Sequence, residues 1–148
     1  MKRRTVVLVL GILWQIFIFT QSMLTGEISS NQSGFIVDIL YPFVHNIGIP
    51  IDVDNFSLLI RKLAHFTEYA ILGLLWYYIY TLFNLNKFLP WIVVIHGVLA
   101  ATLDETIQRF TPNRSGELRD VLIDTLGVLT AVILILLIQK IRRKEVLI

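Results

Sequence analysis

The ionisable side chains of this 148-residue sequence that could do chemistry are concentrated in three short stretches, residues 61–69, 104–114 and 120–124. Together they offer carboxylates for acid–base or metal-binding work, one imidazole, and basic groups that can hold an anion. The sequence has no cysteine, which excludes disulfides, zinc–thiolate sites and thiol catalysis. It also has no nucleophile-elbow serine and no glycine-rich phosphate loop. Acid–base catalysis, metal ligation and anion binding remain.

Helical spacing places the polar residues of these stretches on shared faces. In the first stretch, one face of a helix would carry Arg61, His65, Glu68 and Tyr69. The third stretch continues as a narrow stripe of acidic and then small residues: Asp120, Asp124, Gly127 and Ala131. Small residues on such a stripe let two helices approach closely. The spacing therefore predicts that the polar groups lie where helices pack against each other.

Four long apolar segments must position these residues. Hydrophobic residues make up 55% of the sequence, charged residues 16%, and the mean hydropathy is +0.71, which excludes a water-soluble globule and a disordered chain. The net charge of +2 gives no indication of nucleic-acid binding. A spanning helix needs about 20 mostly apolar residues, and the segments that qualify are residues 5–24, 63–83, 88–110 and 120–138. The first follows a basic start like that of a signal peptide, but no small-residue cleavage site follows it, so we expect a retained helix.

These segments predict a single all-α integral membrane domain over residues 1–148. The short link at residues 84–87 requires the second and third spans to be antiparallel neighbours, so we expect four transmembrane helices in an antiparallel bundle. Residues 25–33 are polar, and residues 35–44 carry apolar side chains at helical spacing. We expect the latter to form a short amphipathic helix on the outer membrane surface, or one that caps the bundle. His96 lies in the middle of the third span, and we interpret it as a contact between helices.

The distribution of lysine and arginine predicts the orientation in the membrane. Eight basic residues fall on the side of the two termini and the 84–87 link, and five fall on the other side. We therefore expect a multi-pass protein of the bacterial cytoplasmic membrane with both termini cytoplasmic. Because successive spans alternate in direction, the start of the second, the end of the third and the start of the fourth meet at the opposite, extracytoplasmic face. Ionisable groups inside spans usually face the interior of a bundle, so the three stretches should form one polar pocket.

The same stretches resemble the motifs of the VanZ-like membrane proteins. Residues 61–73 resemble the first motif, residues 104–114 the second and residues 120–127 the third, in which the family commonly has Asn in place of Asp124. The region around residues 14–30 resembles the family's first helix and the serine-rich loop that follows it. The resemblance implies a four-helix bacterial membrane protein linked to teicoplanin resistance. Wider relatives proposed for the fold include phosphatidylserine synthase-type enzymes, which exchange lipid headgroups.

Taken together, the pocket and the resemblance assign roles to eleven residues. We expect five residues to be catalytic: His65, Glu68, Asp104, Glu105 and Asp120. His65 would act as base or nucleophile with Glu68 orienting it, and the other three would serve acid–base or metal-binding roles. We expect six residues to bind substrate: Arg61, Lys62, Tyr69, Gln108, Arg114 and Asp124. The basic ones among these would hold a phosphate. No zinc signature is completed, so the sequence leaves the cofactor open, with a divalent metal as one alternative.

Our leading hypothesis is a pocket that binds, and transforms, the phosphate-linked headgroup of a membrane phospholipid or a lipid-linked cell-wall precursor. As an enzyme it would be a transferase or hydrolase acting on the headgroup phosphoester. The alternative is a non-catalytic binder of a lipid-linked wall precursor or of a lipoglycopeptide antibiotic. A proton-coupled transporter is a third interpretation, which the lack of broken mid-membrane helices disfavours. The substrate's identity and the oligomeric state are left open by the sequence.

Overall fold

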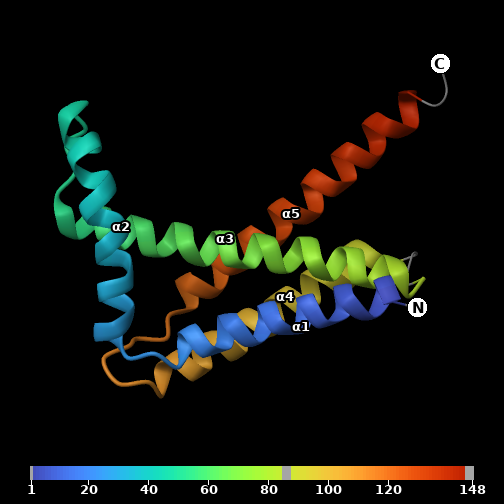
Figure 1. The fold of residues 1–148 in the computed structure, drawn as a ribbon, viewed down its shortest axis with the longest axis horizontal. Helices are drawn as coiled ribbons and strands as arrows, with labels where there is room; N and C mark the ends of the chain where they lie inside the picture. Colours follow the sequence, from blue (N-terminus) through green and yellow to red (C-terminus); the bar gives the residue numbers. More distant parts are fainter. Residues whose placement is uncertain (1, 85–87, 146–148) are drawn as a thin grey trace.

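The chain is built from helices throughout the part that the structure describes. The computed structural model describes residues 2–84 and 88–145, and these residues contain no β-strand. The helices are α1 (Lys2–Ser22), α2 (Gly26–Asn46), α3 (Val53–Leu82), α4 (Leu89–Arg109) and α5 (Leu118–Glu145). In Figure 1, α2 lies across one end of the other four helices. The prediction of an all-α fold is confirmed.

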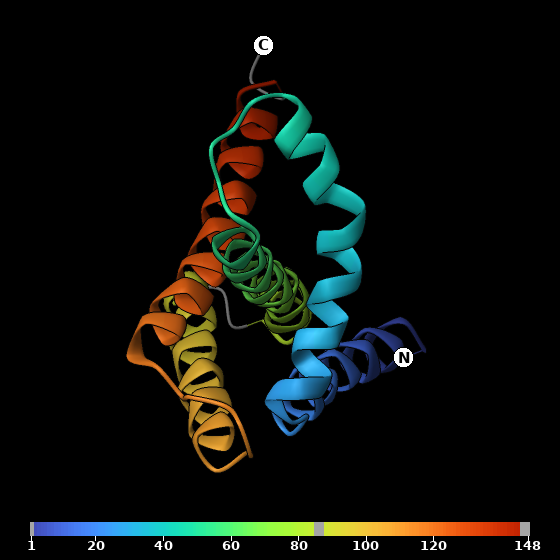
Figure 2. The same ribbon diagram turned by 90° about the vertical axis from the view of Figure 1, so that its left-hand side faces the viewer.

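Among the described residues, three helical segments are long and apolar enough, by length and composition alone, to cross a membrane: Arg3–Ser22, Leu89–Arg109 and Leu118–Arg143. They correspond to the predicted spans at residues 5–24, 88–110 and 120–138. The predicted span at residues 63–83 is not in this group, because His65, Glu68 and several tyrosines make α3 less apolar. Instead, α3 occupies the centre of the fold and packs against each of the other four helices. Figure 2 shows it end-on, between α5 and α2.

The helices alternate in direction. In Figure 1, α1 and α4 end at the same end of the molecule at which α3 and α5 begin. The second and third predicted spans are therefore antiparallel, as expected. Residues 85–87 of the predicted link lie outside the described residues. The alternation brings the end of α4 and the start of α5 beside the first half of α3, which is the arrangement that the polar pocket requires.

The largest departure from the prediction is α2, which begins at Gly26 and not near residue 35. The expected serine-rich loop is therefore wrong, since residues 29–33 are helical. Thr25 caps the helix by accepting a hydrogen bond from the backbone N–H of Ile28 (3.5 Å), and Glu27 lies in the first turn, where the helix dipole favours an acid. Ser29, Gln32 and Ser33 line a cavity against the bundle, whereas Phe35 and Phe43 are 68% and 67% exposed.

The third helix also starts earlier than predicted, at Val53, ten residues before the expected span. The side chain of Asp52 caps it by accepting a hydrogen bond from the backbone N–H of Asn55 (2.9 Å). The hydrogen bonds from Asn55 lower the pKa of Asp52 below its usual value. The added turns of α3 carry Ile60 and Arg61 to the entrance of the polar pocket.

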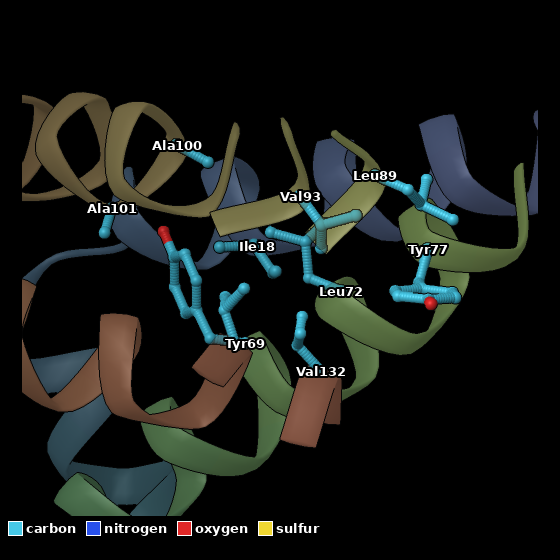
Figure 3. Packing of buried hydrophobic residues seen from close by; sticks show 10 residues of the cluster. Ile18, Tyr69, Leu72, Tyr77, Leu89, Val93, Ala100, Ala101 and Val132 are labelled. Carbon is cyan, nitrogen blue, oxygen red and sulfur yellow. The ribbon is translucent and has the colours of Figure 1, made fainter. Parts of the chain in front are cut away.

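A close crossing of α3 and α5 holds the centre of the fold together. A Cβ atom on Gly127 would lie 2.3 Å from the backbone oxygen of Phe66, and one on Gly73 would lie 3.1 Å from the Cβ of Ala131. The predicted stripe of small residues is thus the contact surface of α5 against α3. Around the crossing, buried apolar side chains from four helices form the core, including Tyr69 and Leu72 of α3 (Figure 3).

His96 contacts the neighbouring helices, which confirms its interpretation as a contact between helices. Its Nδ1 atom lies 2.7 Å from the hydroxyl of Tyr80 on α3, and its Nε2 atom lies 3.0 Å from the side-chain oxygen of Gln15 on α1. Its ring centroid is 4.3 Å from that of Trp76. A half-buried imidazole with both nitrogens bonded can join three helices at one point without a catalytic role.

Candidate functional site

The three polar stretches meet at the end of the bundle where α4 stops and α5 starts. Buried polar side chains gather there at a density that is unusual for an apolar protein. Six of them are at most 7% exposed: Ser22, Asp104, Glu105, Gln108, Asp120 and Asp124. The convergence expected from the alternating directions of the spans is therefore present in the structure. It draws on α1, α3, α4 and α5 together.

Four residues form the centre of this region, which we call the carboxylate–histidine cluster: His65, Asp104, Glu105 and Asp124. Each residue offers one potential ligand atom, a ring nitrogen of His65 or a carboxylate oxygen. These four atoms all lie within 4.8 Å of one another. The three carboxylates are 0–5% exposed, and the side chain of His65 is 15% exposed. The Nδ1 atom of His65 is 3.5 Å from Oδ1 of Asp124. Three acidic groups and one imidazole are types of side chain that can share protons or ligate a metal ion.

A network of hydrogen bonds orients two of the three carboxylates. The side-chain amide of Gln108 donates to Oδ2 of Asp104 and to Oε1 of Glu105, both at 3.0 Å. The hydroxyl of Ser22 donates to the other oxygen of Asp104. The backbone N–H of Glu117 donates to Oε2 of Glu105 at 2.8 Å. Each carboxylate oxygen has two lone pairs, so these bonds fix the groups and still leave acceptor capacity.

Other buried polar atoms of the site have no hydrogen-bond partner among the described residues. Both carboxylate oxygens of Asp124, the Nδ1 atom of His65 and the hydroxyl of Tyr69 make no hydrogen bond there. Asp124 and Tyr69 are each 0% exposed. Leaving a buried polar group unsatisfied costs about 1–3 kcal/mol, so such groups need an explanation.

Two residues that sequence reasoning assigned to the pocket instead form an ion pair at its edge. The ammonium of Lys62 lies 3.2 Å from Oδ1 of Asp120. This pair uses the charge that we expected Lys62 to offer to a phosphate and the carboxylate that we expected to do acid–base work. Asp124, one turn further along α5, lies beside His65. Spacing alone could not separate two aspartates on one face of a helix.

Next to the cluster lies a polar cavity of about 210 Å³, which we call the headgroup cavity. His65, Glu68, Arg61 and Arg114 line one side of it. The other side is lined by polar residues of α1 and α2 that sequence reasoning missed: Gln21, Ser22, Ser29, Gln32 and Ser33. The spacing of Ser29, Gln32 and Ser33, which share one helical face, was the signal that could have identified them. A second hollow of about 330 Å³ shares Ser33 and both arginines with this cavity.

The two arginines of the headgroup cavity are close to each other and have no acidic partner. In the part of the chain that the structure describes, the ion pairs are Lys62 with Asp120 and His65 with Asp124, so neither Arg61 nor Arg114 belongs to one. The Nε atom of Arg114 is buried and makes no hydrogen bond within the described residues. Burial, followed by the like charge of Arg61, lowers the pKa of Arg114. Two neighbouring guanidinium groups that form no ion pair with Glu68 of this cavity or with Asp54 of the adjoining hollow favour an anion between them.

The loop between α4 and α5, which carries Arg114, is held in place by the junction of α1 and α2. The backbone N–H of Gly26 donates to the backbone oxygen of Pro112 (3.1 Å), and the hydroxyl of Thr111 donates to the backbone oxygen of Ser22 (3.1 Å). A Cβ atom on Gly26 would lie 1.8 Å from the backbone oxygen of Asn113, so only glycine permits this approach. The loop is thus fixed where Arg114 reaches the cavity.

An apolar groove of about 400 Å³ runs beside the headgroup cavity. Its walls include Trp14 and Phe17 of α1 and Leu63 and Ile71 of α3. The groove and the cavity share four residues: Ile36, Ile60, Ala64 and Glu68. The indole N–H of Trp14 donates to the backbone oxygen of Glu68 (2.9 Å), which ties α1 to α3 at this boundary. A polar compartment and an apolar one therefore adjoin along about two turns of α3, from Ile60 to Glu68.

The remaining expected site residues fall outside the headgroup cavity. Tyr69 is buried in the apolar core with its hydroxyl toward α4 (Figure 3), and Gln108 lies behind the carboxylates that it orients. Arg109 and Arg119, which were not among the expected site residues, are exposed and do not line the cavity. Of the six residues expected to bind substrate, Arg61 and Arg114 line the cavity.

Comparison with known proteins gives one result. The profile of the family described as VanZ/LLP1 matches residues 7–139, nearly the whole chain. Neither a curated protein nor a solved structure matches the chain. The matched region contains all five helices except the ends of α1 and α5, and it includes the headgroup cavity and the carboxylate–histidine cluster.

Proposed function

Because the chain belongs to the VanZ/LLP1 family, we propose that it is a bacterial membrane protein whose headgroup cavity binds a phosphate-linked lipid headgroup. The single observation that carries this proposal is that a polar cavity and an apolar groove adjoin each other. Arg61 and Arg114 line a polar cavity, and that cavity shares a wall with an apolar groove. A guanidinium pair fits a phosphate, and an apolar groove fits an acyl chain. A ligand that fills both is a lipid with a phosphate in its headgroup.

In this proposal four helices span the cytoplasmic membrane. They are α1, the part of α3 from residue 63 onward, α4 and α5, with both termini cytoplasmic and α2 lying at the outer interface. The lower hydropathy of α3 is compatible with a span because α1, α4 and α5 pack against it and cover part of its surface. The exposed Phe35 and Phe43 of α2 suit an interfacial position. Single cysteines at Ser30, Ser115 and Asn84 test this arrangement, and the first two should react with a membrane-impermeant reagent from outside while the third should not.

Two residues of the cavity wall supply the chemistry in the catalytic form of the proposal. His65 acts as base or nucleophile at the headgroup phosphoester, and Glu68, one turn along the same helix, orients it. The reaction is transfer or hydrolysis of the headgroup. The test is expression of His65→Ala and Glu68→Ala in cells, with membrane lipids and wall precursors compared by mass spectrometry. Profiles identical to wild type at equal protein levels would contradict catalysis.

Binding is tested separately from catalysis with a defined lipid. The purified chain is titrated with a short-chain phosphatidic acid, using tryptophan fluorescence because Trp14 lines the groove. A charged hydrogen bond contributes about 1.5–3 kcal/mol, so Arg61→Gln and Arg114→Gln should each weaken binding about 10- to 100-fold. Arg109→Gln is the matched control, because this arginine is exposed and does not line the cavity. Equal losses in all three variants would mean that surface charge, and not the cavity, holds the lipid.

A non-catalytic binder is the second candidate, and one observation favours it. Asp104 and Glu105, which a catalytic role would need to be available, are fixed by Ser22, Gln108 and the backbone of Glu117. The ligand would be a lipid-linked wall precursor or a lipoglycopeptide, as the family's link to teicoplanin resistance implies. Teicoplanin susceptibility of cells expressing His65→Gln separates the two candidates. A binder keeps its protection with this conservative change, and an enzyme loses it.

A further inference from the structure

The carboxylate–histidine cluster combines buried negative charge with unsatisfied polar atoms. Asp104, Glu105 and Asp124 approach within 4.8 Å of one another and are almost fully buried. Buried charges in proteins are paired or coordinate metals. Lys62 is already paired with Asp120, and Arg114, which acts electrostatically on Asp104 and Glu105, forms no ion pair with either of them. The histidine beside these carboxylates cannot by itself balance three ionised groups.

A second observation points into the same space. Asp124 is 0% exposed, and neither of its oxygens accepts a hydrogen bond from the described residues, although one lies within 4.8 Å of the other three groups. The hydroxyl of Tyr69 is equally buried and unpartnered, and Asp104, Asp124 and Glu105 lie close enough to act on it electrostatically. Apart from the ion pair of Asp124 with His65, these buried oxygens have no partner among the described residues, and together they fit a cation between them.

We propose that His65, Asp104, Glu105 and Asp124 hold one divalent metal ion at the inner end of the headgroup cavity. Metal–oxygen distances of about 2.0–2.6 Å place opposite ligands about 4.0–5.2 Å apart, so a set within 4.8 Å can surround one ion with little movement. Three carboxylates and one imidazole form a mainly hard set, and Mn²⁺ matches this mixture of oxygen and nitrogen ligands. The inference goes beyond the proposed function and does not depend on a lipid.

The surroundings supply the two features that a metal site needs besides its ligands. Gln108, Ser22 and the backbone N–H of Glu117 bond the ligating carboxylates and so fix their orientation, as the outer partners of metal ligands do. His65 gives access, because it lines the headgroup cavity as well as the cluster. An ion held there would lie behind His65, where it can attract the oxygens of a phosphate that the two arginines hold.

The test is Mn²⁺ binding by the purified, chelator-treated full chain, followed by electron paramagnetic resonance of free and bound Mn²⁺. We expect one Mn²⁺ per chain. Asp124→Asn keeps the size of the side chain and removes its charge, and it should weaken Mn²⁺ binding at least about 100-fold. Changing a residue that only hydrogen-bonds a metal ligand already lowers metal affinity about 10- to 100-fold. Asp120→Asn is the matched control: it makes the same change one turn away, in a carboxylate outside the four-residue set, and should weaken Mn²⁺ binding much less than Asp124→Asn does.

Several results would overturn the inference. Wild-type protein that binds no Mn²⁺, Mg²⁺, Ca²⁺ or Zn²⁺ at millimolar concentration would show that protons neutralise the cluster. Equal loss in Asp120→Asn and Asp124→Asn would show that binding follows net acidity and not the four-residue set. If Asp124→Asn does not fold, His65→Gln serves in its place, and retention of full affinity there would also overturn the inference. A failure of lipid binding, by contrast, would leave the metal stoichiometry unchanged and would count only against the proposed function.

Discussion

Replacing Gly127 by alanine should force α3 and α5 apart at the point that positions the carboxylate–histidine cluster. The added Cβ would lie 2.3 Å from the backbone oxygen of Phe66 and 3.0 Å from the backbone nitrogen of Ala70. Both atoms belong to the backbone of α3, so a rotation of a side chain cannot relieve the contact. Asp124 lies one turn from Gly127, and His65 precedes Phe66. The same movement therefore separates the side chains of Asp124 and His65, which form an ion pair.

The size of the effect follows from the distances. Carbon–oxygen contacts between packed segments are about 3.3–3.6 Å, so the helices must separate by about 1 Å at this point. Inserting a methyl group into a well-packed site costs about 1–3 kcal/mol. For a chain of this size, that corresponds to a fall in melting temperature of about 2–12 °C.

Thermal unfolding of the purified protein in detergent, followed by circular dichroism, measures this change. Gly34→Ala is the matched control, because it is also a helical glycine and a Cβ there meets nothing within 4 Å. It should leave the melting temperature unchanged or raise it slightly, since alanine restricts the unfolded chain. A Gly127→Ala protein as stable as the wild type would refute the close crossing of α3 and α5.

Three further changes test other parts of the structure. His96→Leu should lower stability by about 1–3 kcal/mol in a denaturation experiment because it leaves Tyr80 and Gln15 without their partner; unchanged stability would contradict the role of His96 as a junction of three helices. Leu63→Trp should fill the apolar groove and weaken binding of a long-chain phosphatidic acid more than that of glycerol phosphate, and an equal effect on both would place the acyl chain elsewhere. Asp52→Ala should lower the melting temperature at pH 7. Because the pKa of Asp52 is lowered in the folded state, the stability that its charge contributes is complete above the usual pKa of 3.8. This stability is lost as the pH falls through the lowered pKa. A difference in melting temperature between wild type and Asp52→Ala that does not shrink in acid would contradict charged capping.

The convergence of the polar stretches could be predicted from the sequence because it follows from two simple facts. Apolar segments of about 20 residues fix the helices, and short links make their directions alternate. These facts place Asp104 near the end of α4 and His65 near the first half of α3, whatever the details of packing. The bounds of α4 differ from the predicted segment by a single residue at each end, because Pro90 and the polar residues after Asp104 limit the apolar run.

The parts that the sequence did not predict depend on contacts between helices. The polar run at residues 25–33 has no apolar period, so it gave no helical signal of the usual kind. Ser29, Gln32 and Ser33 of this run line the headgroup cavity together with residues of α1 and α3, and this contact between helices cannot be read from the sequence. Likewise, the choice of Asp124 over Asp120 as the partner of His65 depends on where α5 crosses α3. The glycine at position 127 marks this crossing, but its geometry does not follow from spacing alone.

The most direct test of the central claim is an experimental structure of the protein in a lipid nanodisc containing phosphatidic acid. The account predicts density for a phosphate within hydrogen-bonding distance of Arg61 and Arg114, with one acyl chain passing Leu63 and Trp14 in the apolar groove. A headgroup cavity that holds only water, with ordered lipid bound at other faces of the bundle, would contradict it.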